Sequence, residues 1–185
     1  MSRISLEEAR RVLREAELLY TAREVDQAVD RLAAEITRDL ADRNPLILSV
    51  LTGGIVLTGH LVTRLEFPLQ LDYLHATRYR GATHGGELAW IAHPRFPLAS
   101  RHLLIVDDIL DEGLTLQAVV AHCREAGAAS VSTTVLVRKR HDRRPPGVDA
   151  DYVGLEVEDR YVFGFGMDYH DYHRNLHGIY AVRGE

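Results

Sequence analysis

The sequence predicts an α/β fold with a doubly wound, mostly parallel sheet. Strand and helix patterns alternate from residue 46 to residue 137, the order that builds a parallel sheet with helices on both faces. Several of the strand patterns are continuous apolar runs, which is typical of strands buried on both faces. The chain has 185 residues, of which 46% are hydrophobic, enough for one sizeable core. We therefore expect a single domain over residues 1–185.

Helices are expected before the sheet, over residues 1–44. Ser5 and Thr21 each precede a glutamate by three residues, the spacing of a capping box, in which a hydroxyl and a carboxylate satisfy free amides at a helix start. After Thr21, apolar residues recur at helical spacing. We expect two helices, which break near Tyr20, and the second ends before Pro45 because the residue preceding a proline disfavours helix.

The elements of the α/β core follow in order over residues 46–137. Strands are expected at 46–51, 69–77, 87–92, 102–106 and 131–137, and helices at 55–65 and 115–126. The polar segment 78–86 contains three glycines and is expected to be a mobile loop. A basic linker at 138–146 and short strands at 152–157 and 161–165 complete the chain.

Composition and charge argue against several classes of protein. The net charge of -5 does not suit sequence-independent binding of nucleic acid, which needs a basic surface. No apolar run approaches the roughly 20 residues that span a bilayer, and the charged N-terminus does not resemble a signal peptide. Cys123 is the only cysteine, so no internal disulfide can form. We expect a cytoplasmic protein that binds neither nucleic acid nor membranes.

An acidic turn follows the strand pattern 102–106. Asp107, Asp108 and Asp111 come directly after the apolar run, and Gly113 and Thr115 then open a helix. Free amides at a helix start can hold a phosphate, while carboxylates beside them can accept hydrogen bonds from a sugar diol or hold a hydrated Mg2+. The alternative is an acidic turn that only stabilises the positive end of the helix. The complete pattern favours a site for a ribose-5-phosphate unit.

This segment resembles the phosphoribosyl-diphosphate (PRPP) binding signature of the type I phosphoribosyltransferases. The block 151–176 resembles the hypoxanthine-guanine phosphoribosyltransferase branch, and the resemblance covers about residues 21–182. It implies Mg2+ as cofactor, PRPP and a purine base as ligands, and a homodimer or homotetramer. It also implies that residues 138–185 form a small C-terminal hood that binds the purine.

The resemblance assigns a role to each matching residue. Asp107 and Asp108 would hold the ribose hydroxyls, and Asp111 would lie near purine N7 as the general base. The 5-phosphate would be bound by Glu112, Gly113, Leu114 and Thr115. Thr52, Gly53 and Arg174 would contact pyrophosphate, with the first two in a turn where the family often has a cis peptide. Tyr161 would stack on the purine, Val162 would read its edge through the backbone, and Asp168 would bind Mg2+.

The chain departs from the family pattern at three positions. Thr52 stands where the family usually has lysine, which removes a cation near pyrophosphate. Glu112 replaces a small or hydroxyl residue, and we expect its carboxylate to point away from the phosphate. Arg78 and Tyr79 stand in the mobile loop where the family has Ser-Tyr. One hypothesis is that Arg78 supplies the charge that is missing at Thr52.

Lys139 is the only lysine among the 22 Lys and Arg residues. The resemblance places it at the purine 6-position. An ammonium group can only donate hydrogen bonds, so it favours a 6-oxo group over the 6-amino group of adenine. The alternative is chance, since a lone lysine must lie somewhere and a basic linker is a natural place.

The resemblance therefore implies transfer of the 5-phosphoribosyl group from PRPP to hypoxanthine or guanine, which yields IMP or GMP and pyrophosphate. Three alternatives stay open. The acceptor could be another base, xanthine or adenine. The chain could be a regulatory relative that binds nucleotide or RNA without catalysis. It could also be a structural dimer partner with an inactive site.

Overall fold

The computed structural model describes residues 4–78 and 88–184. The helices are α1 (Leu6–Glu15), α2 (Ala22–Leu40), α3 (Gly54–Val62) and α4 (Leu114–Glu125), with a 3-10 turn η1 (Ala41–Arg43). The strands are β1 (Glu17–Tyr20), β2 (Leu46–Val50), β3 (Gln70–Arg78), β4 (Leu88–Ala92), β5 (His102–Leu110), β6 (Ser130–Arg140), β7 (Tyr152–Glu158), β8 (Val162–Phe163) and β9 (Ile179–Ala181).

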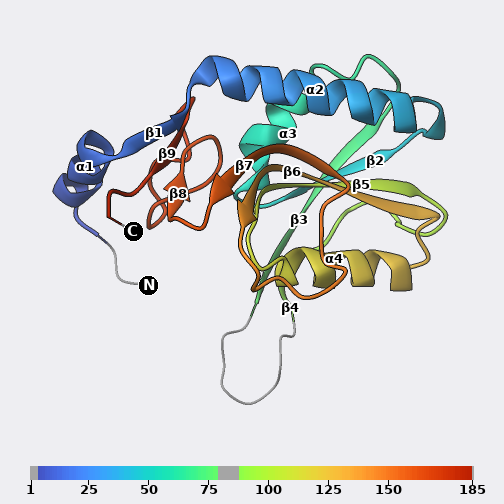
Figure 1. The fold of residues 1–185 in the computed structure, drawn as a ribbon. Coiled ribbons are helices and arrows are strands. Elements are labelled where there is room, and N and C mark those ends of the chain that lie inside the picture. The colour runs from blue at the N-terminus through green and yellow to red at the C-terminus, as the bar shows by residue number, and fades with distance from the viewer. Residues whose placement is uncertain (1–3, 79–87, 185) are drawn as a thin grey trace.

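The larger sheet has the order β4-β3-β2-β5-β6-β7, and its neighbours are parallel except for β3 and β4. In Figure 1, α2 and α3 lie on one face of this sheet and α4 on the other. Alternate residues of one strand supply both faces: Ile47 belongs to the core under α2 and α3, while Leu46 and Leu48 belong to the core under α4. The predicted doubly wound α/β class is confirmed.

A smaller antiparallel sheet, β1-β9-β8, forms a hood at one end of the larger sheet (Figure 1). The prediction of helices alone over residues 1–44 misses β1, because this four-residue strand is defined by pairing with β9 at the far end of the sequence. The local pattern of apolar residues cannot reveal pairing with such a distant segment. Helix α1 joins the hood through an apolar cluster of Val12, Phe163 and Val182.

Three predicted boundaries differ from the structure in ways that matter for the site. Strand β5 does not end at residue 106 but continues to Leu110, and β6 continues through part of the predicted linker to Arg140. Both extensions are supported by their mutual pairing, which includes Leu110 with Arg138. Strand β7 also pairs with β6, so the sheet extends beyond residue 137 into the segment predicted as hood.

The helix starts follow the sequence closely. The Thr21 hydroxyl accepts from the Glu24 amide and the Glu24 carboxylate accepts from the Thr21 amide, so this predicted capping box is present in full. Ser5 likewise accepts from the Glu8 amide. Across the described parts of the chain, no helix combines the length and the apolar character needed to cross a bilayer.

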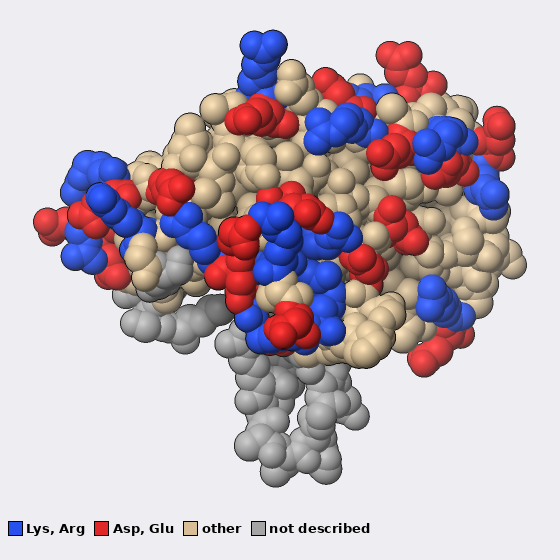
Figure 2. Space-filling model, viewed as in Figure 1, with Lys and Arg blue, Asp and Glu red and all other residues tan. Residues whose placement is uncertain are grey.

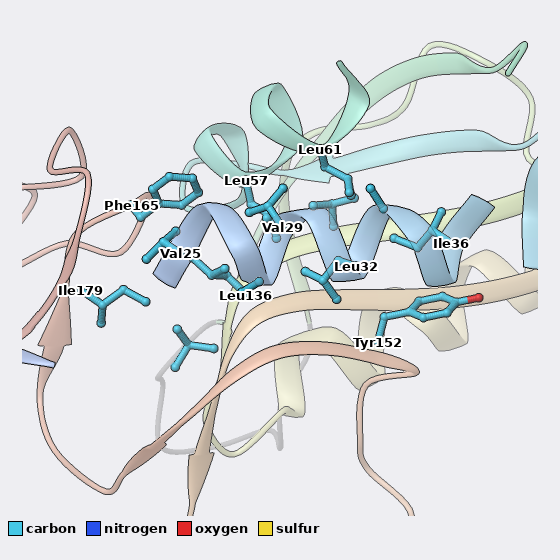
Figure 3. Close-up of a cluster of buried hydrophobic side chains, with 14 of the residues drawn as sticks. Val25, Val29, Leu32, Ile36, Leu57, Leu61, Leu136, Tyr152, Phe165 and Ile179 are labelled. Carbon is cyan, nitrogen blue, oxygen red and sulfur yellow. The ribbon is translucent and has the colours of Figure 1, made fainter. Parts of the chain in front are cut away.

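One face of α2 anchors the core beneath it. Figure 3 shows Val29 and Ile36 of α2 in one cluster of buried side chains with Leu57 and Leu61 of α3. Ile36 is fully buried, so its removal leaves a cavity that the packed neighbours cannot close.

We predict that Ile36→Ala lowers the free energy of unfolding by about 2–5 kcal/mol, from lost burial plus the residual cavity. Urea denaturation followed by circular dichroism measures this. Leu6→Ala is the control, because Leu6 is 55% exposed and its truncation should change stability by less than about 0.5 kcal/mol. Equal effects of the two substitutions would contradict the packing described here.

Candidate active site

Two neighbouring parallel strands end side by side and bring their following turns into contact. The turn after β2 contains Gly53 and Gly54, and it packs directly on the end of β5. A Cβ atom on Gly53 would lie 2.1 Å from Asp108 Oδ2, and one on Gly54 would lie 2.5 Å from the Val106 carbonyl oxygen. Only glycine fits at either position. The Leu51–Thr52 peptide bond is cis, as the resemblance led us to expect.

A third segment, from the hood, closes on the same point. Gly166 has a φ of +105°, and a Cβ atom there would lie 2.3 Å from the Gly53 carbonyl oxygen and 3.5 Å from Asp108 Cβ. A side chain at Gly166 would push the hood off the sheet and would also strain the backbone. Gly53, Asp108 and Gly166 therefore form a direct contact between β2, β5 and the hood.

Asp108 lies in this contact and is buried, and its neighbour Asp107 is partly buried. Burial raises the pKa of both carboxyl groups, and the charge of Asp108 raises that of Asp107 further, to well above its usual value. The amide of Asp108 donates to Asp107 Oδ1 over 2.9 Å. Arg174, with Nη1 3.8 Å from Asp108 Oδ2, offsets part of the rise at Asp108. The pair is an acceptor site that a ligand with hydroxyl donors would stabilise.

Arg174 also connects the acid pair to the predicted metal residue. Its Nη2 lies 2.5 Å from Asp168 Oδ1, and its Nη1 donates to the Gly166 carbonyl oxygen over 2.6 Å. The second carboxylate oxygen of Asp168 accepts from the Asp171 amide over 2.8 Å. Asp108 and Asp168 thus lie on either side of one guanidinium group, and both line the same cavity.

This cavity has a volume of about 200 Å³, and six of the predicted residues line it. Its lining combines carboxylates, one ammonium and apolar groups: Asp108, Ile109, Asp111, Lys139, Tyr161, Val162, Met167 and Asp168. Tyr161 is 38% exposed and meets Tyr169 edge to face, with ring centroids 5.4 Å apart. The side chain of Val162 is buried in β8, so what it can offer a ligand is its backbone.

Lys139 faces the cavity because of its position on β6. Arg138 and Arg140, its neighbours, form ion pairs with Glu156 and Glu158 of β7. Side chains alternate along a strand, so Lys139 points to the other face. There its Nζ lies 2.9 Å from Asp111 Oδ2, and its side chain is only 13% exposed. The lone lysine is therefore a cavity residue on a strand and not part of a solvated linker.

Asp111 is held by donors on both of its carboxylate oxygens. Burial alone would raise its pKa, but the hydrogen bonds from Lys139 on Oδ2 and from His141 on Oδ1 outweigh burial and leave the pKa below its usual value. Asp111 is thus an ionised carboxylate at neutral pH, beside the cavity.

The start of α4 has the expected form of an anion site. Gly113 has a φ of +76°, and a Cβ atom there would lie 2.5 Å from Val148 Cγ1, so glycine is required. Gly113 is the N-cap residue and has no side chain that could cap the helix. The amides of Leu114 and Thr115, in the first turn, have no hydrogen-bond partner within the helix. Glu112 is exposed, and the expectation that its carboxylate points away from a phosphate stays a prediction.

Comparison with known proteins now decides the family. Residues 15–171 match the phosphoribosyl transferase domain. This chain belongs to the phosphoribosyltransferase family. The sequence-based prediction of a type I phosphoribosyltransferase of the hypoxanthine-guanine branch is confirmed.

The relatives of this phosphoribosyltransferase match it over most of their length. The hypoxanthine-guanine-xanthine phosphoribosyltransferase of Tritrichomonas foetus is 33% identical over 159 residues, 86% of this chain and 87% of the relative. The hypoxanthine-guanine phosphoribosyltransferase of Bacillus subtilis is 33% identical over 160 residues, 86% and 88% of the two chains. The structure of a hypoxanthine phosphoribosyltransferase from Staphylococcus aureus superposes with a TM-score of 0.87 at 26% identity, covering 92% and 94%.

The other predicted residues in the described parts of this phosphoribosyltransferase do not line the cavity, among them Asp107, Gly53, Arg174 and residues 112–115. Thr52 is exposed in the turn after β2. Arg78 is the last residue of β3, and Tyr79 with the rest of the predicted loop up to residue 86 lies outside the described residues. The proposed compensation of Thr52 by Arg78 stays a hypothesis.

His141 is a site residue that the sequence analysis misses. It follows β6 directly, two positions after Lys139, and the alternation of a strand places both on the same side. The spacing of two residues between Lys139 and His141 could have identified His141 as a site residue. It is not used there, because residues 138–146 are predicted to be a linker and not a strand. Asp111, His141 and Asp159 also offer ligand atoms within 4.8 Å of one another. Lys139 and Arg143 already neutralise this group, so it does not suit a metal ion.

We predict that Asp107→Asn stabilises the unliganded phosphoribosyltransferase at pH 7 while it weakens PRPP binding. The raised pKa means that the fold disfavours the charged form of this carboxyl group, a cost that a neutral amide avoids. The melting temperature should rise by about 2–4 °C for each kcal/mol gained. Calorimetry without ligand measures it.

The sign of the pH dependence provides the control. A raised folded pKa lowers stability as the pH rises from the unfolded value, about 3.9, through the folded value. The advantage of Asp107→Asn should therefore shrink as the pH falls to about 4. A variant less stable than wild type at pH 7 would contradict the buried-charge interpretation.

Proposed function

We propose that this phosphoribosyltransferase transfers the 5-phosphoribosyl group from PRPP to a 6-oxopurine, hypoxanthine or guanine, and releases pyrophosphate. One observation carries the proposal: a single cavity is lined by an acid of the PRPP signature, by the ionised Asp111, and by Lys139 and Tyr161. The relatives from Tritrichomonas foetus and Bacillus subtilis bear the names of hypoxanthine and guanine enzymes, which supports the same substrate class.

The sugar and its 5-phosphate fit the end of β5 and the start of α4. Asp107 and Asp108 would accept hydrogen bonds from the ribose 2- and 3-hydroxyls, which relieves two poorly solvated carboxylates. The amides from Glu112 to Thr115, at the start of α4, and the Thr115 hydroxyl would bind the 5-phosphate. A diol site and an anion site so close along the chain match a ribose-5-phosphate.

Pyrophosphate would lie beside Thr52, Gly53 and Arg174. The carboxylate oxygens of Asp108 and Asp168 at one cavity are the donors that Mg2+ prefers, so the residues present fit this ion, and Asp168 would hold it. When bound, Mg2+ would neutralise negative charge on the pyrophosphate leaving group. Arg174 would add its own positive charge on the same side, since it already bridges Asp108 and Asp168.

The purine would lie between the hood and Lys139. Tyr161 would stack on its face, the backbone of Val162 would read its edge, and the Lys139 ammonium would donate to the 6-oxo group. A 6-amino group would place donor against donor, which disfavours adenine.

The residues at the cavity then divide the chemistry. The bond between ribose C1 and pyrophosphate breaks ahead of the new bond to the purine, so positive charge develops on the sugar. Asp111, ionised and beside Lys139, accepts the proton from purine N7. Water must be kept from the sugar cation, because water would react with it in place of the purine.

Two other functions are less well supported. Xanthine is a further candidate acceptor because the Tritrichomonas foetus relative is named for it as well. A regulatory protein that binds RNA would need a basic surface. Figure 2 instead shows Lys and Arg interspersed with Asp and Glu on the face in view, and the whole chain carries a net charge of -5.

We also propose that the protein is a homodimer or homotetramer in the cytoplasm. Leu71 and Tyr73 on one face of β3, Ile91 on β4 and Ile55 on α3 are each about half exposed or more, an apolar surface that suits a second copy. The single, buried Cys123 suits a reducing compartment. Sedimentation at micromolar concentration tests the first statement, and cell fractionation tests the second.

The base preference is the direct test of the proposed function. With PRPP and Mg2+, nucleotide should form from hypoxanthine or guanine and not from adenine, followed by ultraviolet absorbance. Lys139→Ala should raise the KM for the purine by at least about tenfold, the effect of losing one charge-assisted hydrogen bond. Arg140→Ala is the matched control, because Arg140 points to the other face of β6. Preference for adenine would overturn the proposal.

Asp111→Asn tests the general base. We predict that kcat falls about 100- to 10,000-fold, because an amide cannot accept the N7 proton. PRPP affinity should change by less than about threefold, since Asp107 and Asp108 still hold the ribose. Steady-state kinetics and equilibrium binding of PRPP measure the two effects. Equal losses in kcat and in PRPP binding would make Asp111 a binding residue and not the base.

A further inference from the structure

We infer that His141 is a positioning residue that orients the carboxylate of Asp111 for proton transfer. The inference rests on the proposed function, in which Asp111 accepts the N7 proton of a purine. His141 does not line the cavity and would not touch the substrate. It would act through Asp111 alone.

The ring of His141 is fixed by contacts on both of its nitrogens. Its side chain is only 4% exposed, and Nε2 lies 2.8 Å from Asp111 Oδ1. Its Nδ1 accepts from the backbone amide of Arg143 over 3.2 Å. Because an amide can only donate, Nδ1 carries no proton, and the proton of the neutral ring is on Nε2. His141 therefore donates to Asp111, and the turn of the backbone at Arg143 selects this tautomer.

The two oxygens of Asp111 have different partners, and the partners differ in mobility. Oδ1 is held by the buried ring of His141, and Oδ2 is held by Lys139, which lines the cavity. Lys139 has a flexible four-carbon side chain, and the proposed function moves its ammonium toward the purine 6-oxo group. Once Lys139 has turned to the purine, His141 still holds Oδ1, which leaves Oδ2 directed at N7.

Nearby contacts limit what else could orient this carboxylate. Arg144 donates to the carbonyl oxygen of Asp111 over 3.1 Å and to that of Lys139 over 2.7 Å, so it fixes the backbone and not the carboxylate. Arg143 Nη2 lies 3.4 Å from Asp111 Oδ1, but its guanidinium is about half exposed and forms its main ion pair with Asp159. With the backbone fixed, rotation of the Asp111 side chain is the freedom that His141 removes.

Two nearly isosteric substitutions separate this role from packing. In His141→Gln the side-chain amide nitrogen takes the place of Nε2 and can still donate to Asp111. In His141→Asn the amide nitrogen corresponds to Nδ1 and stops short of Asp111. We expect His141→Asn and His141→Leu to lower kcat by about tenfold to a hundredfold, a part of what a positioned base contributes. PRPP affinity should stay within about twofold, and His141→Gln should restore most of the lost kcat.

A double-mutant cycle with Asp111→Asn gives the second readout. Without a base to orient, His141→Leu should lower the remaining kcat by no more than about twofold. An equal loss of kcat with the native Asp111 and in the Asp111→Asn background would make His141 a structural residue and overturn the inference. So would an unchanged kcat in His141→Leu, or equal activities of the Gln and Asn variants at matched melting temperatures.

The outcomes also separate this inference from the proposed function. If His141→Leu does not fold, the comparison of the Gln and Asn variants decides. A wild-type protein that forms no nucleotide from any 6-oxopurine would overturn the proposed function itself. An active wild type with an indifferent His141 would overturn only the role assigned to this histidine.

Discussion

The site depends on one contact that admits no side chain. Gly53 lies against the carboxylate of Asp108 on one side and against Gly166 of the hood on the other. A methyl group on Gly53 would overlap the Asp108 carboxylate, and one on Gly166 would overlap the Gly53 carbonyl oxygen and push the hood off the sheet. The contact also explains how a small hood can be placed accurately over the sheet. Its loop packs against backbone atoms, whose positions the parallel strands fix.

The same contact removes Asp108 from water, and its neighbour Asp107 is partly buried. Carboxyl groups a few residues apart at this strand end therefore have pKa values shifted in opposite directions. The acid pair has raised pKa values because burial disfavours both charges, and the charge of Asp108 raises the pKa of Asp107 further. Asp111 has a lowered pKa because Lys139 and His141 donate to it. Carboxylates whose environments separate their pKa values in this way commonly serve different roles, here proposed as binding of a sugar and acceptance of a proton.

The sequence predicts what depends on local pattern and misses what depends on distant pairing. The parallel core follows from apolar runs that alternate with amphipathic helices, and the Thr21 capping box follows from residues three positions apart. Strand β1 cannot be found in this way, because its partner β9 lies at the other end of the chain. Motif and resemblance identify the acid pair and Lys139, but as residues of a turn and a linker. Pairing of β6 with β5 and with β7 continues past the apolar runs and makes them strand residues.

That extension of β5 and β6 matters for chemistry. A lysine in a solvated linker has many orientations, whereas Lys139 on a paired strand has its backbone fixed and only its own rotamers to choose from. The alternation of the strand then sends Arg138 and Arg140 to the carboxylates of β7 and sends Lys139 and His141 to Asp111. Arg138 and Arg140 thereby neutralise the glutamates on their own face of the sheet. Lys139 and His141, on the other face, are left to donate to the single carboxylate of Asp111. A one-residue change of register would exchange the two faces and direct a guanidinium at the cavity, so the register of β6 against β7 determines which cation meets the base.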